Sequence, residues 1–460
     1  MLNNNLLKTI TAIATPPGNG AIAIIRLSGN ESIKIVDKIF KSKSLKKLAD
    51  TQANKVVFGK ITDKNSIIDE VLVTIFRAPN SYTGEDSVEI SCHGSTFIQQ
   101  KILELLINNG ANLAKPGEFT QRAFLNHKLD LSQAEAVSDL IAANTSAAHR
   151  LAIQQMKGGY SEMLNNLRTK LLNLVSLIEL ENDFSEEDVE FADRKQLKNT
   201  VNKIYNIIKK LIQSFSYGNA VKNGIPIAIA GKPNAGKSTL LNTLLQENRA
   251  IVSEIPGTTR DTIEEIINIE GFQFRFIDTA GLRKTTNEIE KIGVNKTYEK
   301  INNSDIFIYL FDINNTTATQ LKNEITKFNK NQPKLIIANK IDLTNKKTIE
   351  QFKNTNQSII FISAKQNKSI NKIKTQLVKF AKNKLQNPND IVITNTRHIE
   401  SLKKIQKAII QTKQNLKNNI SSDLIALDIR NAIYHIGEIT GEITNDDILG
   451  NIFKNFCIGK

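Results

Sequence analysis

The sequence predicts a multidomain protein that combines a small α+β domain, an all-α helical domain and an α/β domain inserted into the helical one. Three observations support this prediction. The 460 residues are enough for about three domains of ordinary size. Helical periodicity stops near Tyr217 and resumes near Ile399. Between these two points, strand-like runs alternate with helical patterns.

The N-terminal segment is typical of a small α+β domain, which we place at residues 1–126. Short β-like runs alternate there with turn signals, and one helical pattern follows them. The predicted strands are Gly20–Leu27, Lys55–Ile61, Val71–Arg77 and Ser87–Ser91, and the predicted helix is Phe97–Asn108.

The next segment predicts long helices, because Pro and Gly become scarce and apolar residues recur at helical spacing. The recurring residues are Leu164, Leu167, Leu171, Leu174 and Ile178. Similar periodicity returns over Ile399–Leu416 and Leu424–Ile436. We therefore expect one helical domain in two parts, at residues 127–219 and 384–460.

The inserted segment, residues 220–383, predicts a mostly parallel sheet with helices on both faces, because strands and helices alternate along it. The predicted strands are Ile225–Ala230, Gln273–Ile277, Ile306–Phe311, Lys334–Ala338 and Ser358–Ile362.

Composition excludes several classes of protein. Hydrophobic residues make up 40% of the chain, and no apolar run approaches the roughly 18 residues of a membrane span. The N-terminus has neither the basic and apolar regions of a signal peptide nor the arginines of a transit peptide, so we expect a cytoplasmic protein without a membrane partner. Cys92 and Cys457 lie far apart and lack metal-ligand spacing, which argues against a disulfide framework or a zinc site.

The charge balance leaves two interpretations open. A formal charge of +15 favours an anionic partner such as nucleic acid, because clustered cations gain from the release of condensed counterions. Lysine, asparagine and isoleucine are all abundant, however, so a compositional bias would give the same excess.

Gly231 to Ser238 fits the P-loop pattern, directly after a predicted strand and before a helix expected to start near Thr239. The backbone N–H groups of such a loop close around phosphates, Lys237 would bridge the β- and γ-phosphates, and Ser238 would bind Mg²⁺. The predicted phosphate-binding residues are Asn234, Ala235, Gly236, Lys237, Ser238 and Thr239.

Asn339, Lys340 and Asp342 follow a later strand, about a hundred residues beyond the P-loop. The Asp342 carboxylate can accept hydrogen bonds from N1–H and the 2-amino group of guanine, neither of which adenine offers. A buried carboxylate without its donors is costly, so this residue would reject ATP. Ser363 and Ala364, after the last predicted strand, are typical of the loop that closes over the base.

Asp278, Thr279, Ala280 and Gly281 end another strand. Asp278 would reach Mg²⁺ through water, the Gly281 N–H would sense the γ-phosphate, and Thr259 is the candidate switch threonine of the metal site. Leu282 stands where many GTPases carry the glutamine that orients the attacking water. An apolar side chain cannot orient water, so hydrolysis would need another group, and Glu290 is the candidate. Together these motifs predict a Ras-like P-loop GTPase domain.

Across its whole length the chain resembles the tRNA-modification GTPases of the MnmE, or TrmE, family. The most specific element is Phe456 to Lys460, with the sequence Phe-Cys-Ile-Gly-Lys. Supporting strings are Thr15 to Gly18, Ile25 to Gly29, Tyr82 to Asp86, Pro116 to Phe119 and Arg122 to Asn126.

The resemblance implies an N-terminal domain that binds a tetrahydrofolate one-carbon donor, either the 5-formyl or the 5,10-methylene form. Arg26, Glu89 and Lys128 match the folate-contacting positions, and Lys460 would arrive from the C-terminus. Charge agrees with this assignment, because cations pair with the glutamate tail of folate and a carboxylate suits the donors of the pterin ring. Without the family, each of these residues would be an ordinary surface charge.

The resemblance further implies addition of an aminomethyl-type group to the wobble uridine of tRNA, together with an FAD-dependent partner called MnmG or GidA, as a heterotetramer. It also implies a homodimer whose GTPase domains meet around K⁺. Asn234 matches the potassium-contacting asparagine, and Glu290 matches the water-positioning glutamate. The loop that would cap K⁺ and line the GTP site comprises Ser253, Glu254, Ile255, Pro256, Gly257, Thr258 and Thr259, with Ser253, Ile255 and Thr258 as K⁺ ligands. Ser253 and Pro256 depart from the commoner threonine and alanine.

Cys457 allows two interpretations. A cysteine four residues from the end suggests a prenylation box, but Gly459 is not aliphatic and Lys460 is not a typical recognition residue. In the family this cysteine is important to the modification reaction, so it joins Lys237 and Glu290 as a candidate catalytic residue. His93 and His127 are expected to be structural. The alternatives to the family assignment are a ribosome-assembly GTPase and a membrane-anchored switch.

Overall fold

The computed structural model describes residues 8–43, 47–64, 66–183, 194–247, 264–278, 304–326, 333–355, 358–384, 391–418, 420–444, 446–454 and 456–459. These residues form two compact units. One comprises residues 1–142, 152–205 and 401–460, and the other comprises residues 143–151 and 206–400. Within the described ranges, no helix is long and apolar enough to cross a membrane.

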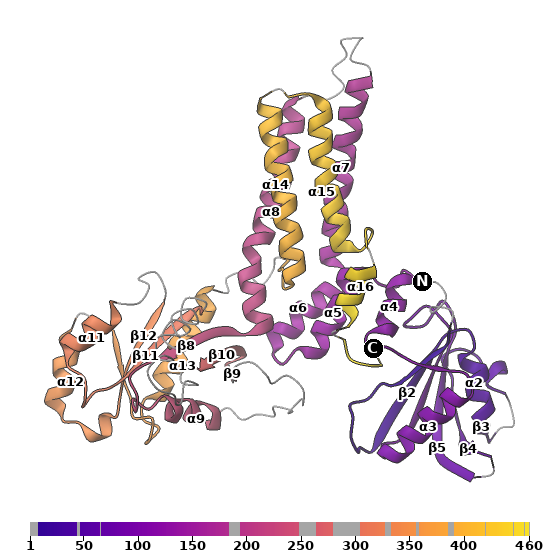
Figure 1. The fold of residues 1–460 in the computed structure, drawn as a ribbon, viewed down its shortest axis with the longest axis horizontal. Coiled ribbons are helices and arrows are strands. Elements are labelled where there is room, and N and C mark those ends of the chain that lie inside the picture. The colour runs from indigo at the N-terminus through magenta and orange to yellow at the C-terminus, as the bar shows by residue number, and fades with distance from the viewer. Residues whose placement is uncertain are drawn as a thin grey trace, which may run out of the picture. The chain divides into compact units, whose positions relative to one another are not determined.

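A seven-stranded sheet forms the N-terminal part of the first unit, in the order β3-β4-β5-β6-β2-β1-β7. Figure 1 labels β2, β3, β4 and β5 of this sheet. All neighbours are antiparallel except β1 and β7. The strands are β1 (Ile10–Ile13), β2 (Ile22–Ser28), β3 (Phe40–Ser42), β4 (Val56–Asp63), β5 (Ser66–Phe76), β6 (Ser87–His93) and β7 (Asn112–Leu113).

Two helices, α2 (Ser32–Ile39) and α3 (Thr96–Asn108), cover one face of this sheet and share a core with it. Alternate residues of β2 and β6 point into that core, for example Ile25 and Ile90, so their neighbours Arg26 and Glu89 lie on the opposite face. A further helix, α4 (Glu118–Leu125), follows β7. The four predicted strands and the predicted helix are present, whereas β1, β3, β7, α2 and α4 were not predicted.

The segments predicted to be helical form helices. They contain α5 (Leu131–Ala142), α6 (Ser146–Met156), α7 (Gly159–Asp183), α8 (Arg194–Asn223), α14 (Thr396–Lys417) and α15 (Ser422–Thr440). The short helix α16 (Asp446–Phe453) was not predicted. The division between the two units falls within α6, α8 and α14. The predicted apolar stripe of α7 is buried along its whole length, from Leu164 to Ile178.

The second unit is built on a six-stranded sheet in the order β13-β12-β11-β8-β10-β9, parallel except for the edge strand β9. Its strands are β8 (Ile225–Ala230), β9 (Glu264–Ile269), β10 (Phe272–Asp278), β11 (Ile306–Asp312), β12 (Lys334–Asn339) and β13 (Ile359–Phe361). Its helices are α9 (Lys237–Glu247), α11 (Ala318–Ile325), α12 (Lys346–Lys353) and α13 (Ile370–Lys384).

Helices cover both faces of this sheet, as the alternation predicted. Leu240 of α9 and Ile373 of α13 belong to the core on one face, and Leu321 of α11 and Phe352 of α12 belong to the core on the other. The sequence pattern did not indicate β9. It placed the start of α9 near Thr239, whereas the helix begins at Lys237.

Candidate functional site

The carboxyl ends of four neighbouring strands define one edge of the second unit. Strand β8 is central, with β10 on one side and β11 on the other, so the order of connections reverses at β8. Ligands of open α/β sheets bind beyond such a reversal. The P-loop follows β8, Asp278 ends β10, Asp312 ends β11 and Asn339 ends β12. The sequence therefore assembles its candidate nucleotide residues at the expected edge.

The P-loop has backbone conformations that its residues can adopt. Asn234 and Gly236 have φ values of 61° and 96°, in the left-handed region that asparagine tolerates and glycine favours. A Cβ at Gly231 would lie 2.0 Å from the Leu310 carbonyl oxygen, so this position accepts only glycine. The Lys237 ammonium donates to the carbonyl oxygens of Gly231 at 2.7 Å and Lys232 at 3.1 Å. These contacts hold the lysine over its own loop.

Ser238 and Thr239 are exposed in the first turn of α9. Asp278 is paired in register with Ile229 of β8, so its backbone lies next to the strand that leads into the P-loop. The Ser238 hydroxyl in the first turn of α9 and the Asp278 carboxylate at the end of β10 are oxygen donors of the kind Mg²⁺ prefers. The described part of the site therefore suits Mg²⁺ bound to a nucleotide phosphate.

Asn339 joins the P-loop to the loop after β13. Its side-chain N–H₂ donates to the Ala235 carbonyl at 2.9 Å, and its Oδ1 accepts from the Ala364 N–H at 3.0 Å. All three residues are buried. Thr243 of α9 adds a third connection by donating to the Ala364 carbonyl at 3.0 Å. Asn339 therefore aligns the phosphate and base loops through buried hydrogen bonds.

Asp342 has the environment expected of a guanine acceptor. Its Oδ1 is buried and has no hydrogen-bond partner among the residues that the structure describes. A buried carboxylate oxygen without a donor is unfavourable, and a base that offers N–H groups would relieve that cost. The unpartnered oxygen therefore fits a guanine.

Lys340 orients the turn before Asp342. It adopts a left-handed conformation, with φ 65°, and its ammonium lies 2.8 Å from the Asp312 carboxylate. Burial by itself raises the pKa of Asp312, but the Lys340 ammonium and hydrogen bonds from Asn314 outweigh it and lower that pKa below its usual value. The ion pair thus persists at neutral pH. Sequence reasoning missed Asp312, although its position at a strand end, like that of Asp278, would have indicated it.

Several predicted residues of this site lie outside the described part of the chain. They are Ser253, Glu254, Ile255, Pro256, Gly257, Thr258, Thr259, Thr279, Ala280, Gly281, Leu282 and Glu290. Their roles in metal binding and hydrolysis stay predictions. Ser363 is buried and accepts from the Gln366 N–H at 3.2 Å, which shapes the base loop together with Ala364.

A second candidate site lies on the N-terminal sheet, around Arg26. Arg26 and Glu89 are register partners on β2 and β6, and the Glu89 Oε1 accepts from the Arg26 Nε at 2.9 Å and from its terminal nitrogen at 2.7 Å. The rings of Tyr82 and Phe119 lie 5.6 and 5.7 Å from the guanidinium carbon. An ion pair beside two aromatic rings suits a flat, polar heterocycle such as a pterin.

The segment 456–459 reaches the same site from the far end of the chain. Its Gly459 carbonyl accepts from Arg26 at 3.4 Å, and the Cys457 carbonyl accepts from the Gly117 N–H at 3.3 Å. The Cys457 thiol is exposed, two residues from the contact with Arg26. Phe456 packs on Phe453 with ring centroids 5.2 Å apart, which anchors the segment. Lys460 lies outside the described residues.

Lys128 is exposed, and its stem lies against Gly84, where an added Cβ would be 3.3 Å from the lysine Cγ. The loop that contains Gly84 also carries Tyr82. Lys128 therefore borders the loop that lines the Arg26 site.

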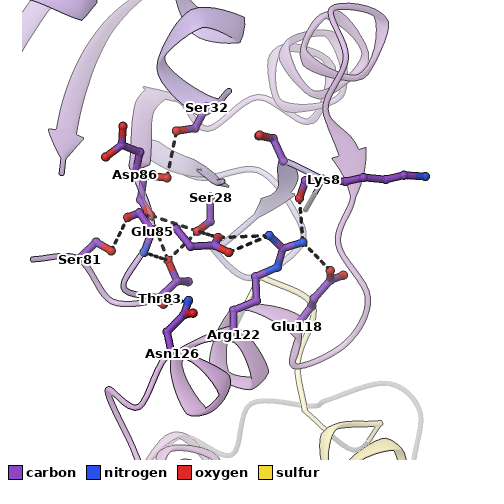
Figure 2. A network of polar contacts seen from close by, with 12 residues as sticks. Lys8, Ser28, Ser32, Ser81, Thr83, Glu85, Asp86, Glu118, Arg122 and Asn126 are labelled. Atoms are coloured by element: carbon purple, nitrogen blue, oxygen red, sulfur yellow. Dashed lines mark hydrogen bonds and ion pairs between the residues drawn. The ribbon is translucent and has the colours of Figure 1, made fainter. Parts of the chain in front are cut away.

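A buried polar network holds that loop against α4, and Figure 2 shows it. Arg122 is 1% exposed and donates to both carboxylate oxygens of Glu85 at 3.2 Å, to Glu118 at 3.0 Å and to the Lys8 carbonyl at 2.9 Å. Ser28 donates to Glu85 at 2.7 Å. The family strings around Tyr82 and Arg122 meet in this network, although sequence analysis assigned the arginine no role. Removing one partner of a buried ion pair costs about 3–5 kcal/mol, so this network fixes the wall of the site.

Within the described residues, no hydrogen bond or ion pair joins His93, His127 or Cys92 to Arg26. His93 is exposed and its Nδ1 lies 2.7 Å from Asp69, whereas His127 is exposed with a φ of 56°. Cys92 is buried, and burial raises the pKa of its thiol to about 11, with a smaller contribution from Asp69. No group of three or more possible metal-binding side chains occurs among the described residues.

Comparison with known proteins extends over nearly the whole chain. The family model for the N-terminus of the GTP-binding protein TrmE matches residues 9–128, and the MnmE helical domain model matches residues 131–457. A tRNA modification GTPase MnmE from Flavobacterium psychrophilum is 52% identical over 457 residues, covering 98% of this chain and 99% of the relative. The corresponding protein of Flavobacterium johnsoniae is 51% identical over 461 residues, with the same coverage.

Among solved structures, Era from Aquifex aeolicus is 25% identical and covers 40% of this chain and 66% of its own, with a TM-score of 0.28. That score is low, so the relationship depends on the sequence matches.

Proposed function

Because the chain belongs to the MnmE family of tRNA modification GTPases, we propose that it couples GTP hydrolysis to the addition of an aminomethyl or carboxymethylaminomethyl group at C5 of the wobble uridine. The ribosome-assembly alternative is disfavoured, because the match includes the N-terminal and helical domains as well as the GTPase domain. The proposal divides the chain into an N-terminal domain (1–126), the first part of the helical domain (127–219), the GTPase domain (220–383) and the second part of the helical domain (384–460).

The observation that carries the nucleotide assignment is the unpartnered Oδ1 of Asp342 beside the loops that Asn339 joins. Asp342 would accept from guanine, and Ser363 and Ala364 would border the base. Lys237 would exchange its contacts with loop carbonyls for contacts with phosphate oxygens. Both are charge-assisted hydrogen bonds, and the phosphate is the stronger acceptor.

Metal ions would complete this site. Ser238 and Thr259 would bind Mg²⁺, which supplies positive charge to the phosphates. Asn234, Ser253, Ile255 and Thr258 would bind K⁺ where two GTPase domains of a homodimer meet, and Glu290 would position the attacking water. The exposure of Asn234 within the P-loop agrees with a position at such an interface.

The Arg26 site would hold the folate. Glu89 would face the donors of the pterin, Tyr82 and Phe119 would cover its ring, and Lys128 and Lys460 would pair with the glutamate tail. When bound, the folate would supply the one-carbon unit, either as the 5-formyl or as the 5,10-methylene form. The chain's own contribution is to orient that ring and to bring the exposed Cys457 beside it. The FAD-dependent partner MnmG would complete the enzyme.

Steady-state GTP hydrolysis tests the proposal. Purified protein is assayed in KCl and in NaCl at equal ionic strength, over a series of protein concentrations. We expect faster hydrolysis in KCl and a specific rate that rises with protein concentration, because the ion and the second domain act together. Equal rates in both salts would remove K⁺ from the mechanism.

The proposed role of Cys457 is tested separately. Cys457→Ser should leave hydrolysis unchanged and abolish tRNA modification. Retained modification would remove the thiol from the reaction.

A further inference from the structure

Positive charge is concentrated on two helices. Helix α8 carries seven Lys and Arg residues and no Asp or Glu, and α14 carries six with Glu400 as its single acid. The two helices hold a net charge of +12, out of +15 for the whole chain. In the same domain, α7 has four acids against two bases, and α15 has three acids against one base. A general excess of lysine would not separate the charges in this way.

The lysines lie on the faces of these helices that point away from the core. On α14, Leu402, Ile405 and Ile409 are buried, whereas Lys403, Lys404, Lys407 and Lys417 are exposed. On the first turns of α8, Leu197, Val201 and Ile204 are buried, whereas Lys198 and Lys203 are exposed. We call these six lysines the basic ridge.

The two helices are adjacent within the first unit. The Lys413 ammonium of α14 lies 4.4 Å from the centroid of the Tyr205 ring of α8, and the ribbons run side by side (Figure 1). From Lys403 to Lys417 the ridge is about 21 Å long, at roughly 1.5 Å per residue.

Within the described ranges, no ridge lysine has a hydrogen-bond or ion-pair partner for its ammonium group. Cations on the neighbouring helices do have partners, for example Arg168 with Glu442 and Arg430 with Glu179. Lys403 and Lys407 are like charges four residues apart, an arrangement that destabilises a helix by a few tenths of a kcal/mol. An anionic partner would remove this repulsion.

We propose that the basic ridge binds the phosphate backbone of the substrate tRNA, along a double-helical stem. This inference rests on the proposed function, which supplies an RNA substrate. A row of unpaired ammonium groups matches a row of phosphates, and their association releases counterions. The ridge has no aromatic member on which bases could stack, and Tyr205 already faces Lys413. The contact would therefore position the tRNA without reading its sequence.

Binding of a fluorescently labelled tRNA transcript, measured by anisotropy over a series of KCl concentrations, tests this inference. The variant replaces Lys403, Lys404 and Lys407 with glutamine. We expect affinity to fall at least about tenfold near physiological salt, and the slope of log K against log salt to become shallower by about 2, because each lost phosphate contact removes about 0.7–0.9 from that slope. Lys198→Gln with Lys203→Gln, on the other helix, should weaken binding in the same direction.

A matched control replaces Lys346, Lys347 and Lys353, three exposed lysines of α12, with glutamine. It removes the same charge from another surface and should leave affinity and slope close to wild type. Helical content and GTP hydrolysis, measured on every variant, report whether the fold and the nucleotide site are intact.

The possible results distinguish a failure of the basic ridge as the RNA-binding surface from a failure of the proposed function. Wild-type affinity in the Lys403, Lys404 and Lys407 variant, or equal losses in ridge and control variants, would overturn the ridge as the RNA surface and leave the GTPase assignment untouched. Loss of binding to the partner protein with unchanged tRNA affinity would likewise overturn it. If the wild-type protein hydrolyses no GTP, the proposed function fails, and the inference fails with it.

Discussion

Replacing Asn339 with alanine removes the connection between the phosphate loop and the base loop. Two groups then lose their partners, the Ala235 carbonyl and the Ala364 N–H, and both residues are buried, at 1% and 3% exposed. An unsatisfied buried polar group costs about 1–3 kcal/mol, so the loss of both partners should lower the free energy of unfolding by about 2–6 kcal/mol. Water that enters the space left by the amide can hydrogen-bond to these groups, which reduces the cost. We therefore expect the free energy of unfolding to fall by about 2–4 kcal/mol.

The assay has two readouts. Denaturant unfolding of the wild type and the variant gives the change in stability, and titration with a fluorescent GDP analogue gives the change in affinity. If the loops lose their alignment, part of this cost should also weaken nucleotide binding. Affinity should then fall about tenfold for each 1.4 kcal/mol of binding free energy that is lost.

Asn345→Ala is the matched control, because Asn345 is an exposed N-cap of α12 whose Oδ1 accepts from the Thr348 N–H at 2.9 Å. Losing that cap should cost about 1 kcal/mol and leave nucleotide affinity unchanged. If Asn339→Ala unfolds like the control and still binds the GDP analogue with wild-type affinity, the alignment role is refuted.

Three further predictions concern single side chains. Asp342→Asn should lower GTP affinity about a hundredfold, because two charge-assisted hydrogen bonds are lost. The variant should instead favour xanthosine triphosphate, whose C2 carbonyl accepts from the new amide. Unchanged GTP preference in calorimetry would contradict this prediction. Arg26→Met should abolish binding of 5-formyltetrahydrofolate in equilibrium dialysis, whereas Arg77→Met, which removes a half-buried arginine paired with Asp86, should not. Iodoacetamide at pH 8 should label the exposed Cys457 and spare the buried Cys92. The raised pKa of about 11 keeps the Cys92 thiol protonated until the pH approaches that value. Labelling of Cys92 at pH 8, detected by mass spectrometry, would contradict this prediction.

Much of the fold could be predicted from sequence because its elements carry strong local patterns. Strand β8 was predicted at its observed bounds, and the apolar stripe of α7 proved buried throughout. Strands β1 and β7, of four and two residues, were not predicted, because so short a segment has no measurable periodicity of its own. The three-residue β13 was predicted from its place in the alternation of strands and helices. The edge strand β9 was also not predicted. It pairs with β10 on one side only, and this pairing depends on the neighbouring strand rather than on a pattern within β9 itself.

The nucleotide site could be predicted at the level of which loops meet, because parallel strands bring their carboxyl ends to one edge. The partners of individual side chains could not. Nothing in the sequence indicates that Asn339 would join Ala235 to Ala364, since those residues are separated by 104 and 25 positions. The Arg122 network was missed for the same reason, as it joins Lys8, Glu85 and Glu118 through tertiary contacts alone.

The contact between Arg26 and Gly459 joins residues 433 positions apart, and it has a consequence for synthesis of the chain. At about 5–20 residues per second, a ribosome would add Gly459 on the order of 20 to 90 seconds after Arg26. The N-terminal domain can fold during that interval, but its Arg26 site stays incomplete. Translation that stops early would leave a folded domain without the carbonyl of Gly459 and without Cys457. The site can therefore form only after residue 459 has been synthesised.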